Sequence, residues 1–154
     1  MLNIYIDADA CPVNQGVYRV ADRFKLHVFL VSNTFMRVPD NKLIKPVIVD
    51  NTPDAADNWI VEKASEGDIV ITADIPLASR SLKKEACVIS PSGKYFTQEN
   101  IGQILATRNL LADLRDSGEI TGGGPAPFTK RDRSNFLQRL DELIHSILRK
   151  FPDR

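Results

Sequence analysis

The chain has few of the residues that mark several common classes of protein. Of its 154 residues, two are cysteine and two are histidine, and they are too far apart to form the close pairs of a zinc site. Two cysteines also make no disulfide framework, so we expect free thiols in a reducing cytoplasm. No apolar run approaches the roughly 20 residues that span a bilayer, and the first residues lack the basic region of a secretory signal. The sequence therefore predicts a cytoplasmic protein that does not enter a membrane.

Motifs of several enzyme classes are missing as well. Neither a G-x-S-x-G motif nor a dinucleotide fingerprint occurs, and no Gly-Lys-Ser/Thr follows the chain's run of three glycines. Cys11 stands between an apolar run and a predicted helix, as the nucleophile of some phosphatases does. Those enzymes need an arginine six positions later, where this chain has Val17. The sequence thus argues against Walker-type, serine-hydrolase and cysteine-phosphatase chemistry.

An excess of one charge is also absent, since 20 Lys and Arg residues balance 20 Asp and Glu residues. The distribution is uneven: residues 1–77 carry 7 basic against 11 acidic side chains, and residues 78–154 carry 13 against 9. A neutral protein exerts no general attraction on nucleic acid. We expect any phosphate-bearing partner, such as RNA, to be held by a local basic patch from the second half.

Short apolar runs alternate with helix-like segments along the chain. Runs rich in β-branched residues predict strands at 2–6, 25–32, 45–50, 68–73 and 86–90. Amphipathic spacing and capping residues predict helices at 12–24, 52–67, 76–85, 97–117 and 129–150. Residues 33–44 are expected to form a loop and residues 90–96 a turn.

Strands that are apolar throughout and separated by helices are typical of a parallel sheet covered on both faces. We therefore predict one domain over residues 1–154, a three-layer α/β/α fold with a five-stranded, mainly parallel sheet. Strand order 3-2-1-4-5 is expected, because strands 1 and 4 then flank the switch point where such sheets bind ligands. Helices 97–117 and 129–150 pack on this domain, or the apolar face of the last helix packs on a second copy in a homodimer.

Aspartates gather at the predicted carboxyl ends of strands. Asp7 and Asp9 follow the first strand one residue apart, and Asp74 follows the fourth. In the predicted order these strands are neighbours, so the three carboxylates meet at one crevice. Asp54 and Asp57 open the helix between strands 3 and 4, and one of them is expected to reach the same rim.

Carboxylates this close either raise one another's pKa values or bind a hard divalent cation. Mg²⁺ or Mn²⁺ held by Asp7, Asp9, Asp74 and Asp57 is the expected cofactor, and such a site suits phosphodiester hydrolysis. The structural alternative is helix capping, which accounts for Asp54 and Asp57 equally well. Asp74 and Asp9 also precede predicted helices, but capping by Asp9 leaves Asp7 without an explanation.

A second candidate region is glycine-rich and basic, "TGGGPAPFTKRDR" at 121–133. Gly122, Gly123 and Gly124 permit a close approach to a ligand, and a helix begins at Thr129. Arg131 and Arg133 lie in its first turn, where cations are unfavourable unless an anion is near. We predict that the three glycines, Arg131 and Arg133 contact substrate phosphates, with a solvated connector as the alternative.

Five stretches of the chain form a specific series of motifs: "DADACPV", "PDAADNWI", "GDIVITADIPLA", "GKYFTQENI" and "GGGPAPFTKRDRSNF". Together they resemble the YaiI/YqxD family of uncharacterised bacterial proteins over nearly the whole chain. That family is grouped with PIN-like domains, whose nuclease members hold a divalent metal on strand-end aspartates. The resemblance implies a PIN-like fold and a catalytic site at Asp7, Asp9 and Asp74. Asp57 or Asp54 stands where nucleases often have a helical acid.

We therefore expect a metal-dependent nuclease or phosphodiesterase acting on RNA or another nucleic acid. Two rival functions remain open. The Asp-x-Asp pattern matches phosphomonoesterases of the haloacid-dehalogenase kind, with Asp7 as nucleophile and Asp74 as the later acid, except that Cys11 replaces their Thr or Val. The other rival is a non-catalytic module that binds RNA or a nucleotide.

Overall fold

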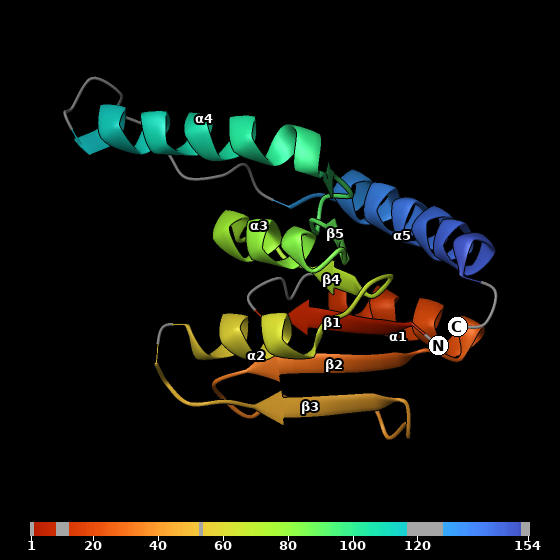
Figure 1. Cartoon of the computed structure of the whole chain (residues 1–154). Helices are drawn as coiled ribbons and strands as arrows, with labels where there is room; N and C mark the ends of the chain where they lie inside the picture. The colour runs from red at the N-terminus through yellow and green to blue at the C-terminus, as the bar shows by residue number, and fades with distance from the viewer. Residues whose placement is uncertain (1, 9–12, 53, 117–127, 152–154) are drawn as a thin grey trace.

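The computed structural model describes residues 2–8, 13–52, 54–116 and 128–151 of the chain. Helices and strands alternate through most of it, as the sequence predicts (Figure 1). In chain order the elements are β1 (Asn3–Asp7), α1 (Asn14–Phe24), β2 (His27–Ser32), β3 (Ile44–Ile48), α2 (Ala55–Lys63), β4 (Ile69–Ile71), α3 (Ile75–Lys83), β5 (Cys87–Ile89), β6 (Tyr95–Phe96), α4 (Gln98–Asp116) and α5 (Lys130–Lys150).

The strands form one sheet in the order β3-β2-β1-β4-β5-β6. The first five are parallel, which confirms the predicted order 3-2-1-4-5. The predicted strand count is wrong, because Tyr95 and Phe96 add a sixth strand antiparallel to β5. A strand of two residues is too short to show the alternation that identifies strands in a sequence. It forms because a tight turn, closed by a 2.9 Å hydrogen bond from the Ser90 amide to the Lys94 carbonyl, reverses the chain.

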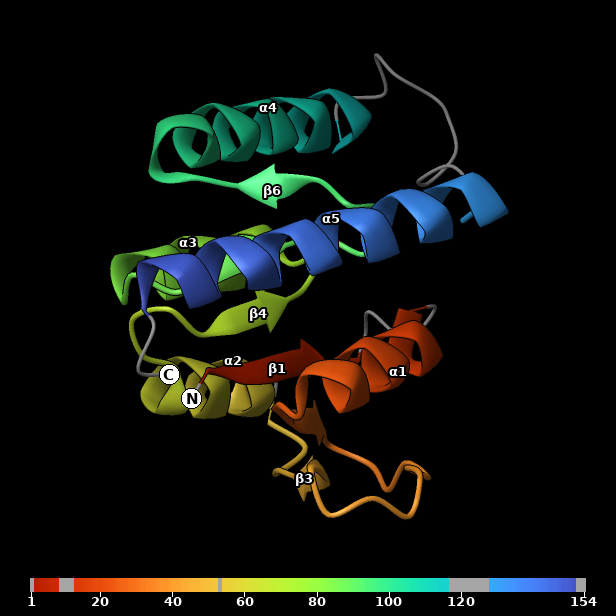
Figure 2. The same cartoon turned by 90° about the vertical axis from the view of Figure 1, so that its right-hand side faces the viewer.

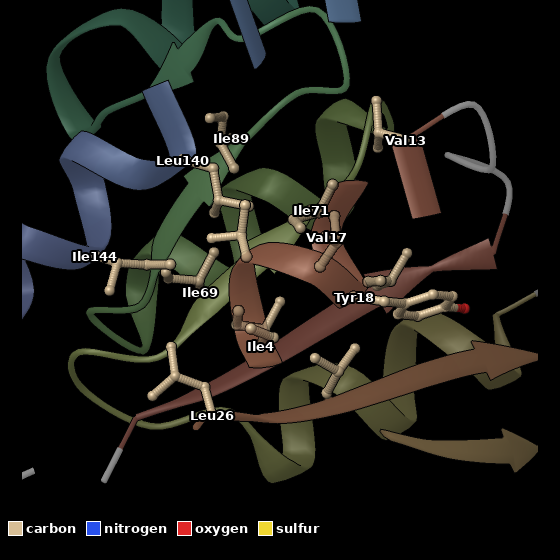
Figure 3. Packing of buried hydrophobic residues seen from close by; sticks show 14 of the residues in the cluster. Ile4, Val13, Val17, Tyr18, Leu26, Ile69, Ile71, Ile89, Leu140 and Ile144 are labelled. Carbon is tan, nitrogen blue, oxygen red and sulfur yellow. The ribbon is translucent and has the colours of Figure 1, made fainter. Parts of the chain in front are cut away.

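Side chains of the central strands alternate between the two faces of the sheet. Ile4 and Ile6 of β1 belong to a core cluster with residues of α1 and α5, whereas Tyr5 belongs to a second cluster with residues of α2 and α3. Helices therefore cover both faces, and the three-layer α/β/α fold is confirmed. Figure 2 views the side that α1 and α5 cover, and Figure 3 shows side chains of the first cluster at close range.

Helix α5 packs on its own domain through the apolar face that the sequence predicts. Its fully buried residues are Phe136, Leu140 and Ile144. An ion pair between Arg23 of α1 and Asp141 adds a polar contact at the edge of this packing. Thr129 begins the helix with a capping box, in which Thr129 and Asp132 each accept a hydrogen bond from the other's backbone N–H. The domain thus accounts for the apolar face, and the expected homodimer stays a prediction.

None of the helices in the described part of the chain combines the length and the apolar character needed to cross a bilayer.

Candidate aspartate pocket

The parallel sheet brings residues from distant parts of the chain to one edge. Asp7 is the last residue of β1 and pairs with Val31 of β2. Asp50 follows the end of β3 by two residues, and Asp74 follows the end of β4 by three. Because parallel strands all end at the same edge, these three carboxylates lie on the same side of the molecule. The beginning of α2 lies at this edge too and contributes Asp54 and Asp57.

A pocket of about 160 Å³ opens at this edge. Five of its lining residues are aspartates, namely Asp7, Asp50, Asp54, Asp57 and Asp74. Its other described lining residues are small or uncharged: Ala8, Val31, Ser32, Asn33, Thr52 and Ala56. We call this group the aspartate pocket. No described lining residue carries a positive charge.

Thr72 ties the two central aspartates together. It is fully buried beyond the end of β4, and its hydroxyl donates a 3.0 Å hydrogen bond to Oδ2 of Asp7. The same hydroxyl oxygen accepts a 3.0 Å hydrogen bond from the backbone N–H of Asp74. Asp74 in turn caps α3, since its Oδ1 accepts a 2.9 Å hydrogen bond from the N–H of Leu77. Hydrogen bonds therefore orient the carboxyl groups of Asp7 and Asp74 within the pocket.

Asp57 shows the electrostatic consequence of this crowding. Its pKa is raised from 3.8 to about 6, and the largest cause is burial, which disfavours the charged form. Repulsion from Asp74 and Asp7 comes next, followed by that from Asp54. The positive charge of Arg80 has the opposite effect and lowers the pKa of Asp57. Neighbouring carboxylates therefore add to the effect of burial and favour the protonated form of Asp57.

The donor set of the pocket matches a hard cation in chemistry. Magnesium and manganese prefer carboxylate oxygens, and Mg²⁺ needs only one or two of them because it keeps several water ligands. As the side chains are placed, no group of three or more His, Cys, Asp or Glu among the described residues is close enough to hold a metal ion. The pocket thus suits a cation bound by one or two carboxylates and water. A cation held directly by three carboxylates would require their side chains to move.

Comparison with known proteins shows the family. The model of the "Uncharacterized BCR, YaiI/YqxD family" matches residues 5–146. The chain belongs to the YaiI/YqxD family. Similar relatives include a UPF0178 protein of Rhodopseudomonas palustris (strain TIE-1), 56% identical over 150 residues that cover 97% of this chain and 94% of the relative. A UPF0178 protein of Azorhizobium caulinodans is 53% identical over 148 residues, covering 96% and 92%. No solved structure matches the chain significantly.

In this YaiI/YqxD protein the structure brings together three of the four predicted metal ligands. Asp7, Asp57 and Asp74 all line the aspartate pocket, whereas Asp9 lies outside the described residues. A side chain can cap a helix and also line the pocket, since Asp74 caps α3 and is one of the lining residues. Asp54 occupies the N-cap of α2 without a side-chain capping hydrogen bond, so capping does not account for its carboxylate.

The predicted phosphate-binding residues lie apart from the pocket or outside the described part of the chain. Gly122, Gly123 and Gly124 belong to the residues that the structure does not describe. Arg131 and Arg133 are exposed in the first turn of α5, and neither lines the aspartate pocket. The guanidinium of Arg133 lies 5.9 Å from the centre of the Phe128 ring. Their contact with substrate phosphates stays a prediction.

The sequence patterns did not identify Asp50, which lines the pocket, or Thr72, which donates a hydrogen bond to Asp7. Asp50 follows "KPVIV" just as Asp7 follows "LNIYI", so the rule that found Asp7 also applied to Asp50. Thr72 gave no such signal, because a threonine inside "DIVITA" is ordinary for a strand. Its role as the donor to Asp7 depends on the pairing of β1 with β4.

Proposed function

We propose that this protein is a cytoplasmic, divalent-cation-dependent phosphodiesterase that hydrolyses RNA or another nucleic acid at the aspartate pocket. One observation carries the proposal: five carboxylates line a single pocket, where burial first and the neighbouring carboxylates second raise the pKa of Asp57 to about 6. Carboxylates crowded in this way gain most from a cation that neutralises them. The sequence motifs resemble a family that is grouped with PIN-like domains, and the same chemistry in the nuclease members of that group supports the proposal.

The roles of the residues follow from their positions. Asp7, oriented by the hydroxyl of Thr72, and Asp74, oriented by the N–H of Leu77, would hold Mg²⁺ or Mn²⁺. Asp9 is a further predicted ligand. When bound, the cation would orient the phosphate, activate water and stabilise the charge that develops on the phosphate. Asp57 would complete the ligand set or accept the proton of the attacking water, since a carboxylate with a pKa of about 6 is a competent base near neutral pH.

The direct test is cleavage of single-stranded RNA and DNA oligonucleotides in Mn²⁺, by the wild type and by Asp7→Asn and Asp74→Asn. We expect both variants to lose at least 100-fold in rate, on the order of the effects found for removing a group that acts on the transition state. Asp113→Asn is the matched control, because Asp113 is exposed on α4 and does not line the pocket. Equal rates in all four proteins, or no cleavage by the wild type, would contradict the proposal.

A binding experiment tests the cation separately from the reaction. A ligand that binds only the folded state stabilises it, by about 2.7 kcal/mol at a concentration of 100 times its Kd. We therefore expect Mn²⁺ to raise the Tm of the wild type at pH 7.5 and to raise that of Asp7→Asn much less. The effect should weaken below about pH 6, because protons then compete with the cation for Asp57. A shift in Tm that is the same for both proteins would count against binding at this pocket.

The two rival functions give different outcomes in the same experiments. A phosphomonoesterase of the haloacid-dehalogenase kind would form a covalent phosphate on Asp7, detectable by mass spectrometry or trapped with a phosphate mimic. Such enzymes also use a lysine, and no lysine is among the described residues that line the pocket. A binding module would instead retain its affinity for RNA in EDTA and show no turnover with any metal.

A further inference from the structure

We infer that Phe35 is a stacking platform that holds a base of a single-stranded nucleic acid beside the aspartate pocket. The inference rests on the proposed function and adds to it the form of the substrate and a residue that positions it. Phe35 lies in the segment between β2 and β3, which Figure 2 shows as an orange loop below α1.

The chain itself keeps Phe35 close to a residue that lines the pocket. Asn33, the first residue after β2, is part of the pocket lining. Phe35 follows two residues later, so its Cα lies within about 7 Å of the Cα of Asn33, the limit for an extended chain. The path between them is held by a 3.1 Å hydrogen bond from the backbone N–H of Thr34 to Oγ of Ser32, which also lines the pocket.

The segment beyond Asn33 is anchored by alternate side chains. Met36 and Val38 are partly buried and pack against the core cluster that contains residues of α1. Phe35 and Arg37, which alternate with them, are exposed. The two partly buried side chains hold the backbone of this segment against the domain. An anchored backbone has less conformational entropy to lose when a ligand stacks on the ring that it carries.

Phe35 is also the most exposed large apolar side chain of the described residues, at 76%. The others, Ile48, Leu110 and Leu111, are aliphatic. A single exposed apolar residue is common on protein surfaces and needs no explanation. The informative feature is its place, since an exposed aromatic ring and an arginine stand two residues apart next to a pocket lined with carboxylates.

That combination matches the chemistry of an unpaired nucleotide. Proteins that bind single strands stack bases on aromatic rings, which tolerate any base because each has a π face, and hold the backbone with basic side chains. In a duplex the faces of the bases are already stacked and cannot reach such a ring. Arg37 would offset the repulsion between the strand's phosphates and the pocket. The substrate class is therefore single-stranded nucleic acid, which would approach the pocket from the side of β2.

The test measures binding with a probe that reports stacking. A single-stranded RNA hexamer that contains 2-aminopurine is titrated in Ca²⁺ with the wild type, Phe35→Ala, Phe35→Leu and Phe35→Trp. We expect quenching of the probe by the wild type and by Phe35→Trp. The Ala and Leu variants should both lose about 5- to 150-fold in affinity, the range that corresponds to one base–aromatic stack. Ile48→Ala, which truncates another exposed apolar side chain on edge strand β3, is the matched control and should bind like the wild type.

Three results would overturn the inference: no binding by the wild type, wild-type affinity in Phe35→Ala, or equal affinity in the Leu and Trp variants. Cleavage in Mn²⁺ separates this inference from the proposed function. If Phe35→Ala raises KM for the hexamer and leaves kcat near the wild-type value, both stand. If Phe35→Ala cleaves normally with an unchanged KM, only the inferred role of Phe35 is contradicted. If stacking depends on Phe35 but the wild type does not cleave the hexamer, the inference about Phe35 stands and only the proposed hydrolysis is contradicted.

Discussion

The hydroxyl of Thr72 donates a 3.0 Å hydrogen bond to Oδ2 of Asp7, a residue 65 positions earlier in the chain. Both side chains are buried, so the bond orients the Asp7 carboxylate where little water competes for it. The pair joins β1 to the end of β4, and Asp7 lines the aspartate pocket. It is therefore the contact through which the fold of the sheet most directly determines the geometry of the pocket.

A double-mutant cycle tests this contact. Thr72→Val keeps the shape of the side chain and removes its hydroxyl, while Asp7→Asn removes the charge that the hydroxyl satisfies. We expect a coupling free energy of about 1–2 kcal/mol between the two changes, because a hydrogen bond to a buried charged group contributes more than a neutral one. Urea unfolding of the wild type, both single variants and the double variant measures it. Additivity within about 0.5 kcal/mol would show that the bond contributes nothing.

The raised pKa of Asp57 predicts a stability that depends on pH. A carboxyl group whose pKa is raised by folding stabilises the native state only while it is protonated. That contribution is complete below about pH 4 and is lost as the pH rises through about 6. We expect Asp57→Asn to raise the free energy of unfolding by about 1 kcal/mol at pH 7.5 and to leave it unchanged near pH 4. The gain is modest because solvent screens a partly exposed group and because the variant loses a favourable charge in the first turn of α2.

Asp113→Asn, on exposed α4, is the control for this measurement and should change stability by less than about 0.5 kcal/mol at either pH. The prediction is contradicted if Asp57→Asn destabilises the protein at pH 7.5 or has the same effect at both pH values.

We predict that replacing Gly93, in the turn that precedes β6, destabilises the protein. The φ of +92° at Gly93 is rarely adopted by residues with a side chain, and an added Cβ would lie 3.0 Å from backbone atoms of Asn135 and Phe136 in α5. We expect Gly93→Ala to lower the free energy of unfolding by about 2 kcal/mol, because backbone atoms cannot give way cheaply. Gly102→Ala is the matched control: its Cβ would meet nothing within 4 Å. Inside exposed α4 it should stabilise by about 0.5–1 kcal/mol, and equal effects of the two substitutions would refute the prediction.

Leu140 tests the packing of α5 on the domain. It is fully buried in the cluster that also contains Ile4 and Ile69 of the central strands (Figure 3). We expect Leu140→Ala to lower the free energy of unfolding by about 2–5 kcal/mol, as for other truncations of buried leucines. The control is Leu110→Ala on α4, where the leucine is 59% exposed and the change should stay within about 0.5 kcal/mol. A small effect at Leu140 would mean that α5 contributes little to the core.

Local sequence patterns were sufficient for most of the fold and for part of the candidate site. The run "LNIYI" followed by Asp7, and the run "DIVITA" followed by Asp74, are strong strand signals with an acidic residue directly after them. Parallel strands separated by helices allow few arrangements, so these signals also predicted that both carboxylates reach one edge of the sheet. The amphipathic period of α5 likewise predicted that one face of this helix is apolar, and that face packs on the domain.

Tertiary structure alone decided the remaining features, because each depends on atoms that are distant in sequence. The hydroxyl of Thr72 meets Asp7 only when β4 pairs with β1. The pKa of Asp57 rises because the folded chain shields it from water and also gathers three other carboxylates around it. Strand β6 exists because a turn at Gly93 folds two residues back against β5. Periodicity reports which side of an element is apolar, whereas these contacts depend on which elements lie next to one another.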